Sequence, residues 1–135
     1  MDILGGAHDG AAVDRLSPVL GPERLRALIS TASMVRVDDA VKHYIVELTA
    51  TTRSLPEVAL GVSPRGSVAL LRAARAAALA DGRNYVLPED VKALAVAVLA
   101  HRIVLTPKAA MQGRTADDVL AEVAGAVPVP HVTAA

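Results

Sequence analysis

Residues 61–82, GVSPRGSVALLRAARAAALADG, contain a helix start, a helix body and a helix stop in one stretch. Pro64 restricts Ser63 to extended backbone, which is the conformation of an N-cap residue, and proline favours the first position of a helix. The alanine- and leucine-rich run has high helix propensity, and Gly82 suits the helix end. We therefore predict a helix from Pro64 to about Ala80, with these candidate core positions: Val68, Leu71, Ala74, Ala78 and Leu79.

Arg65 is the unusual residue of this stretch, because it falls in the first helical turn. The free backbone N–H groups there carry partial positive charge, so a cation is mildly disfavoured unless an anion joins it. Gly66 costs a helix about 1 kcal/mol relative to alanine, but its missing side chain lets another backbone or a ligand come close. Ser63, Pro64, Arg65 and Gly66 thus form a candidate anion site, with Arg72 about two turns further on the same face. The alternative is an arginine that extends over a loop into water.

Four more helices are predicted from the same start signals and from apolar residues at helical spacing. Their beginnings are marked by Pro22, Asp38, Pro88 and Thr115, each as a first helical proline or an N-cap residue. The apolar stripes of the first two helices are Leu25, Leu28, Ile29 and Ala32, and then Val41, Tyr44, Ile45 and Leu48. Those of the last two are Val91, Leu94, Ala95, Val98 and Leu99, and then Val119, Leu120 and Val123.

The segments between these helices are short. Threonines and Pro56 weaken the second helix at its end, and residues 54–62 are predicted to form a loop. The β-branched segments 34–37 and 102–105 are predicted to be extended and could pair with each other, although such short strands barely make a sheet. Residues 106–113 suit a turn or a single helical turn.

Together these elements predict an all-α fold, a small helical bundle of four to five helices with short connecting extended segments. We expect residues 1–20 to form a leader, residues 21–126 to form the helical domain and residues 127–135 to form an extended tail.

The composition excludes several classes of protein. The 135 residues carry no net charge, which argues against a dedicated nucleic-acid binder. Cysteine is absent, so there is neither a disulfide framework nor a thiolate metal site. The first ten residues lack the pattern of a signal peptide, and charged residues or prolines interrupt every apolar run well before membrane-spanning length. We expect a cytoplasmic protein with no membrane insertion.

Motifs for catalysis are missing as well. No phosphate loop of the G-x-x-x-x-G-K-[ST] type is present, and no apolar strand ends in a pair of acids that could hold magnesium. No histidine accompanies the serines in a nucleophile motif. His43 and Glu47 are four residues apart, but without further ligands they are better explained as a solvated pair than as a metal site. We predict no metal site and no catalytic residue in this chain alone.

The sequence nevertheless resembles a known family. Residues 61–109, from GVSPRGS through GRNYVLPEDV to VLAHRIVLTPKA, closely resemble the C-terminal lid of MoxR-type AAA+ ATPases, which reads G-A-S-P-R-G-S, G-R-x-Y-V-x-P-x-D-V and A-P-x-V-L-x-H-R. VDDAVKHYIVELTATTR, residues 37–53, resembles the preceding lid helix, and GRTADDVLAEVAGAVPVP, residues 113–130, resembles the family's usual ending. The resemblance covers about residues 13–130. Val62 and Val96 depart from it, since relatives are expected to carry Ala and Pro there.

This resemblance implies a helical lid that closes over ATP bound to a separate α/β core. Arg65 corresponds to the "sensor 2" arginine that contacts the nucleotide phosphates, with Ser63, Pro64 and Gly66 around it. The partners implied are the AAA+ core of the same chain and of a neighbouring subunit, in a hexameric ring that remodels or matures other proteins, often ones with a von Willebrand A-like domain. ATP and Mg²⁺ are implied for the full-length protein only, and the parent protein is expected to be an ATPase.

The core domain itself is missing from this sequence, and residues 1–20 look like the end of such a core. Two other functions stay open at this point. One is a stand-alone helical protein-interaction domain that uses exposed aliphatic residues and has no nucleotide role. The other is a helix-turn-helix-like DNA binder. Arg72 and Arg75 favour this function, whereas the neutral net charge argues against it.

Overall fold

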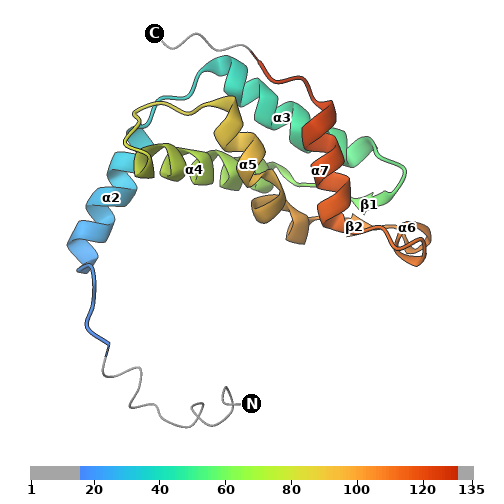
Figure 1. Cartoon of the computed structure of the whole chain (residues 1–135), viewed down its shortest axis with the longest axis horizontal. Coiled ribbons are helices and arrows are strands. Elements are labelled where there is room, and N and C mark those ends of the chain that lie inside the picture. Colours follow the sequence, from blue (N-terminus) through green and yellow to red (C-terminus); the bar gives the residue numbers. More distant parts are fainter. Residues whose placement is uncertain (1–15, 131–135) are drawn as a thin grey trace.

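A computed structural model describes residues 16–130 of the chain. These residues form six α-helices and a two-stranded sheet (Figure 1), which confirms the predicted all-α fold. In chain order the elements are α2 (Pro22–Met34), α3 (Asp39–Ser54), β1 (Val58–Leu60), α4 (Pro64–Ala80), α5 (Pro88–Leu99), the 3₁₀-helix η1 (Ala100–Arg102), β2 (Val104–Leu105), α6 (Pro107–Met111) and α7 (Ala116–Ala126).

Helices α3, α4, α5 and α7 enclose the core. Each contributes one leucine with no exposed surface, namely Leu48, Leu70, Leu99 and Leu120. Alanines on α4 and α5 fill the space between these two helices, and such small side chains let helix axes lie close together. The buried residues of α4 are Gly66, Leu70, Ala74 and Ala78, so its buried face repeats every four residues.

The predicted core of α4 is therefore right in part. Ala74 and Ala78 are buried as expected, and Leu71 and Leu79 are partly buried against the core. Val68 was wrongly predicted, because 47% of it is exposed and Leu70 occupies the core in that turn. The apolar stripes of α3 and α7 are confirmed: Val41, Tyr44, Ile45, Leu48, Val119, Leu120 and Val123 are all buried. In α5, Val91, Ala95 and Leu99 are buried, while Leu94 and Val98 are partly buried.

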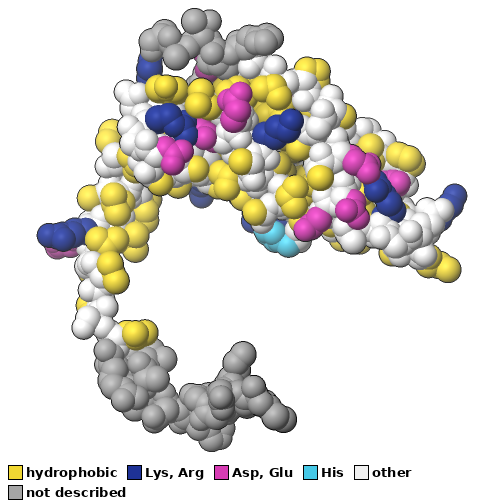
Figure 2. All heavy atoms as spheres, viewed as in Figure 1, with side chains coloured by type: hydrophobic (Ala, Val, Ile, Leu, Met, Phe, Trp, Pro, Cys, Tyr) yellow, Lys and Arg dark blue, Asp and Glu magenta, His cyan; other side chains and the backbone are white. Residues whose placement is uncertain are grey.

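Helix α2 differs from the other long helices because none of its residues is buried. It packs against α4 and otherwise leaves the bundle at one end (Figure 1). Its apolar stripe faces outward, with exposed fractions of 50% for Leu25, 47% for Leu28 and 63% for Ile29. Figure 2 shows the resulting hydrophobic side chains over α2. The aliphatic residues at helical spacing in α2 therefore form an exposed face of the described structure.

The small sheet corrects a second prediction. β2 pairs antiparallel with β1, with Val58 opposite Leu105 and Leu60 opposite Val104, so residues 102–105 do not pair with residues 34–37. Instead Arg36 forms a parallel bridge with Tyr85. The two candidate partners lie at opposite ends of α3, and 16 helical residues span about 24 Å. The strand that pairs with β2 directly follows α3 and contacts it, so the segment before α3 lies too far away to pair with β2. The predicted loop 54–62 therefore contains strand β1.

The end of α3 is more ordered than its composition predicts. The helix runs through the threonines to Ser54, and Thr49 and Thr52 are buried. Their hydroxyls donate to helix carbonyls, Thr49 to Ile45 O (3.0 Å) and Thr52 to Thr49 O (2.7 Å). Tertiary burial here outweighs the modest helix propensity of threonine.

Two further predictions concern the remaining parts of the chain. Residues 106–113 form the five-residue helix α6 and a turn, as expected. Residues 1–15 of the predicted leader and 131–135 of the predicted tail lie outside the described residues. Among residues 16–130, no helix has both the length and the apolar character needed to cross a membrane.

Candidate functional site

The candidate anion site lies at the start of α4. Ser63 is the N-cap residue, with extended backbone at φ −75° and ψ 163°, and Pro64 and Arg65 are the first two helical residues. The first turn closes when the Gly66 N–H donates to the Ser63 carbonyl oxygen at 2.8 Å. The side chain of Ser63 makes no cap hydrogen bond, so Ser63 holds the predicted position without the predicted side-chain contact.

Helix α6 begins with the same pattern of a hydroxyl residue, a proline and a cation, but its N-cap side chain does cap the helix. Thr106, Pro107 and Lys108 stand where Ser63, Pro64 and Arg65 stand in α4, and the Thr106 hydroxyl accepts a hydrogen bond from Ala109 N at 3.3 Å. Side chains also cap α3, through Asp38, and α7, through Thr115. Helix α4 therefore starts with a polar residue whose side chain does not cap it. Pro64 has no N–H and the Gly66 N–H is bonded to Ser63, so within residues 64–66 the Arg65 N–H is the one left for an anion.

Arg65 is exposed, and within residues 16–130 it has no hydrogen-bond or ion-pair partner. Two other arginines are fully engaged. Arg114 binds Glu57 and Glu122, and Arg83 binds Asp81 and Asp90.

The ion pair with Arg83 also contributes to a lowered pKa of Asp90. Burial alone would raise the pKa of this carboxyl, but hydrogen bonds from the Arg83 guanidinium and the Leu87 N–H outweigh burial and hold it below 3.8. Arg83 is thus a structural arginine, whereas Arg65 has a free guanidinium beside a helix N-terminus.

The position of Gly66 requires glycine, because another part of the chain fills the space that a side chain would occupy. A Cβ at this position would collide with the Val62 side chain and lie 3.5 Å from both Leu99 Cδ2 and Arg102 Cδ. Val62 has no exposed surface, and Gly66 is buried. Of the two reasons that the sequence offered for a glycine here, close approach of a neighbouring part of the chain is the one that the structure supports.

Gly61 has a similar role on the other side of the loop. A Cβ there would lie 2.7 Å from Arg53 Cγ and 2.8 Å from Arg53 Cα, so Gly61 rests on the last turn of α3. The two glycines therefore allow the loop to lie between α3 and the start of α4.

Three residues of α3 bind this loop and the first turns of α4, and we call Thr49, Thr52 and Arg53 the α3 clamp. The Val62 N–H donates to Thr52 Oγ1 at 3.0 Å, and the Val62 carbonyl oxygen accepts from Arg53 Nη1 at 2.8 Å. The hydroxyls of Thr49 and Ser67 are 2.8 Å apart. The clamp was not predicted from the sequence, because the threonines were interpreted there as residues that weaken the end of the helix. The available signal was their spacing, since Thr52 continues the buried positions of Ile45 and Leu48.

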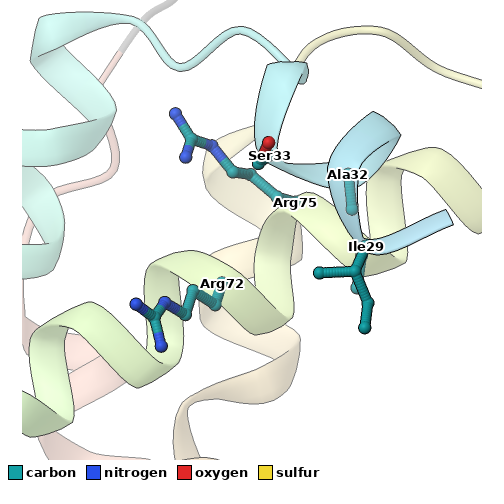
Figure 3. Close-up of a pocket in the computed structure, with 6 residues that line it drawn as sticks. Ile29, Ala32, Ser33, Arg72 and Arg75 are labelled. Atoms are coloured by element: carbon teal, nitrogen blue, oxygen red, sulfur yellow. The ribbon is translucent and has the colours of Figure 1, made fainter. Parts of the chain in front are cut away.

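A groove lies further along α4, between this helix and α2. Arg72 is seven residues after Arg65, about two helical turns, and is exposed. Figure 3 shows the groove, a cavity of about 590 Å³ that α2 and α4 line with Ile29, Ala32, Ser33, Arg72, Arg75 and Ala76. The Nε of Arg75 is buried and has no hydrogen-bond partner among the described residues. The groove combines aliphatic walls with two arginines.

The described residues offer no group of three histidine or acidic side chains that could bind a metal. His43, which the sequence placed near Glu47, lies with Nδ1 2.7 Å from the carbonyl oxygen of Asp39. The chemistry of the start of α4 is therefore that of cationic and N–H donors.

Comparisons with known proteins identify the family of the chain. The AAA lid domain family matches residues 50–123, more than half of the chain, and this span includes Arg65 and the whole of α4. The chain belongs to the AAA lid domain family. Its named relatives identify it further as a lid of the MoxR-type AAA+ ATPases.

The lid is 42% identical over 130 residues to the uncharacterized protein YeaC of Bacillus subtilis (strain 168), covering 96% of the lid and 41% of YeaC. It is 33% identical over 132 residues to the chaperone MoxR1 of Mycobacterium tuberculosis, covering 84% of the lid and 35% of that protein.

A similar solved structure is that of a putative ATPase from Cytophaga hutchinsonii, with a TM-score of 0.71 and 28% identity over 80% of the lid and 34% of that chain. The lid thus spans less than half the length of each of these proteins.

Proposed function

We propose that this lid closes over ATP bound to the AAA+ core of a longer MoxR-type ATPase, and that Arg65 is its sensor 2 contact to the phosphates. The observation that carries the proposal is the unpartnered guanidinium of Arg65 at a helix start without a side-chain cap. The positive end of the helix dipole, the Arg65 N–H and the Arg65 guanidinium together favour a phosphate over any neutral ligand. Ser63 adds a hydroxyl beside this site, and Pro64 fixes the direction in which the helix leaves it.

The donor set fits phosphate and not a metal. No carboxylate pairs with Arg65 in the described part of the lid, so its full charge is available to an anion. In the proposed full-length ATPase, Mg²⁺ would be held by the core, because the described residues of the lid provide no cluster of metal ligands. ATP supplies the phosphoryl group that is transferred to water. The lid's contribution is to bind and orient the phosphates through Arg65 when it closes.

The exposed face of α2 and the groove beside α4 give the lid its docking surface. Leu25, Leu28 and Ile29 remain at least 47% exposed, which is unusual for an aliphatic stripe at helical spacing. We propose that the AAA+ core of the same chain and of a neighbouring subunit covers them, in a ring that we expect to be hexameric. Arg72 and Arg75 add positive charge to the groove, so the docked surface is expected to present carboxylates.

We further propose that ATP binding and hydrolysis in this ring drive the remodelling or maturation of partner proteins in the cytoplasm. One relative, MoxR1, is named a chaperone. Partners with a von Willebrand A-like domain are the class that we would test first.

The test of the nucleotide role is phosphate release by the full-length ATPase with Arg65→Ala. We expect turnover to fall ten-fold or more, the scale lost with one positioned charge or donor at a reacting group. The matched control is Lys108→Ala, because Lys108 holds the equivalent position at the start of α6. Normal hydrolysis by Arg65→Ala would remove Arg65 from the mechanism.

A further inference from the structure

The α3 clamp holds the chain on both sides of Arg65, at Val62 in the loop before α4 and at Ser67 in the first turns of α4. We infer that Thr52 is a positioning residue, which fixes Arg65 for its phosphate by binding the backbone of Val62. This inference rests on the proposed contact between Arg65 and ATP.

The first attachment lies three residues before Arg65. Both backbone polar groups of Val62 are bonded to side chains of consecutive α3 residues, its N–H to Thr52 at 3.0 Å and its carbonyl oxygen to Arg53 at 2.8 Å. Val62 has no exposed surface, and neither has Thr52. Water therefore cannot replace the Thr52 hydroxyl, and its loss would leave the buried Val62 N–H unsatisfied, whereas the Arg53 side chain is exposed.

The second attachment lies two residues after Arg65. The Thr49 and Ser67 hydroxyls are 2.8 Å apart, and Thr49 is buried while Ser67 is partly buried. The bond joins α3 directly to the first turns of α4. Between these attachments the chain has only Ser63, Pro64, Arg65 and Gly66, and Pro64 has a fixed φ. The backbone of Arg65 consequently moves with α3.

Catalysis is sensitive to this kind of support, since a misplacement of 1 Å caused by a distant mutation can cost about 100-fold in rate. Thr52→Val keeps the shape of the side chain but removes the acceptor for the Val62 N–H. We expect it to raise the KM for ATP by about three- to ten-fold, below that limit, because the Arg53 and Thr49 contacts remain. Thr52→Ser keeps a hydroxyl on the same turn and should restore the wild-type KM.

Thr51→Val is the matched control. Thr51 is the adjacent residue of the same type, and its hydroxyl donates at 2.9 Å only to Glu47 O of its own helix. The experiment measures kcat and KM for ATP in the full-length ATPase, well below the thermal midpoint of each variant. It also includes the double variant Thr52→Val with Arg65→Ala. A positioning residue acts through Arg65, so Thr52→Val should change KM in the wild type and leave it unchanged when Arg65 is absent.

The outcomes distinguish failure of the positioning role of Thr52 from failure of the proposed contact between Arg65 and ATP. If Arg65→Ala impairs the enzyme and the effects of Thr52→Val and Arg65→Ala multiply, Thr52 acts independently of Arg65 and the positioning inference is wrong. The same conclusion holds if Thr51→Val raises KM as much as Thr52→Val. If Arg65→Ala changes nothing, the proposed function fails and the inference fails with it. Where Thr52→Val yields too little folded protein, Ser67→Ala removes the second attachment and takes its place in the same cycle.

Discussion

The Val62 side chain occupies the space in which a side chain on Gly66 would lie. Glycine at the third position of α4 is therefore a packing requirement as well as a neighbour of the proposed phosphate contact. From the sequence, the missing side chain of Gly66 could have made space for a ligand. In the structure, the Val62 side chain fills that space.

Gly66→Ala should consequently destabilise the lid. Alanine in a helix normally gains about 1 kcal/mol over glycine, but overpacking of a tight contact costs about 1–3 kcal/mol. We expect a net loss in the free energy of unfolding, measured by urea denaturation. Gly125→Ala in α7 is the control, because a Cβ there meets nothing within 4 Å. It should be neutral or stabilising, and equal gains from both substitutions would contradict the contact.

Arg65→Ala should leave the stability of the lid unchanged or raise it slightly. A cation near the positive end of α4 has no compensating partner in the described residues, and its removal relieves about 0.3–1 kcal/mol at low ionic strength. A thermal melt of the isolated chain measures this, and added salt should shrink the gain. A clear loss of stability would favour the alternative from the sequence, in which Arg65 packs over a loop.

Asp90 should account for part of the acid sensitivity of the fold. Its side chain is 11% exposed and binds Arg83 through both oxygens, so Asp90→Asn should cost about 2 kcal/mol at pH 7. Because the pKa of Asp90 is lowered in the folded state, this stability is present above the unfolded value near 3.8 and is lost as the pH falls through the folded value.

The check is urea denaturation from pH 7 to pH 2, in which the gap between the wild type and Asp90→Asn should narrow below pH 3.8. Asp81→Asn is the control on the same guanidinium. Its side chain is 66% exposed, so it should cost less than about 1 kcal/mol. A gap that stays constant with pH would show that the Asp90 charge is not what stabilises the pair.

Substitution on the α2 face should separate docking from folding. Ile29 is 63% exposed, so Ile29→Asp should change the melting temperature of the isolated chain little. In the full-length ATPase, a charge at this face should weaken ring assembly, measured by sedimentation. Val46→Asp on α3, at a site 56% exposed and away from the groove, should leave assembly intact. Unchanged assembly with Ile29→Asp would remove α2 from the proposed interface.

Local signals explain why so much of the fold could be predicted from sequence. Pro22, Pro64, Pro88 and Pro107 all stand at the first position of a helix, where proline acts through its own ring and needs no tertiary contact. Pairing of residues 102–105 could not be predicted in this way, because the choice of partner depends on the length and direction of α3.

The residues of the candidate site could be named from the sequence, whereas the contacts that hold them in place could not. The resemblance singled out Arg65, but whether Arg65 has a partner depends on the positions of acids far away in the sequence. Ser63 was expected to cap, and the side-chain direction that decides this is not encoded in residue type. Thr49 and Thr52 were interpreted from their low helix propensity alone. Their role depends on their hydrogen-bond partners Ser67 and Val62, which are distant in the sequence.

The exposure of α2 ties its helicity to its surroundings. A helix of 13 residues with no buried side chain lies near the length at which isolated helices are marginal in water. Contact with a covering surface would therefore also shift its helix–coil equilibrium, so that docking and helix formation become one cooperative step. The ordering entropy of α2 then opposes association, which makes the contact weaker and more readily reversed than its apolar area implies. If the lid opens and closes in every cycle of turnover, as we propose, it gains from an attachment of that kind.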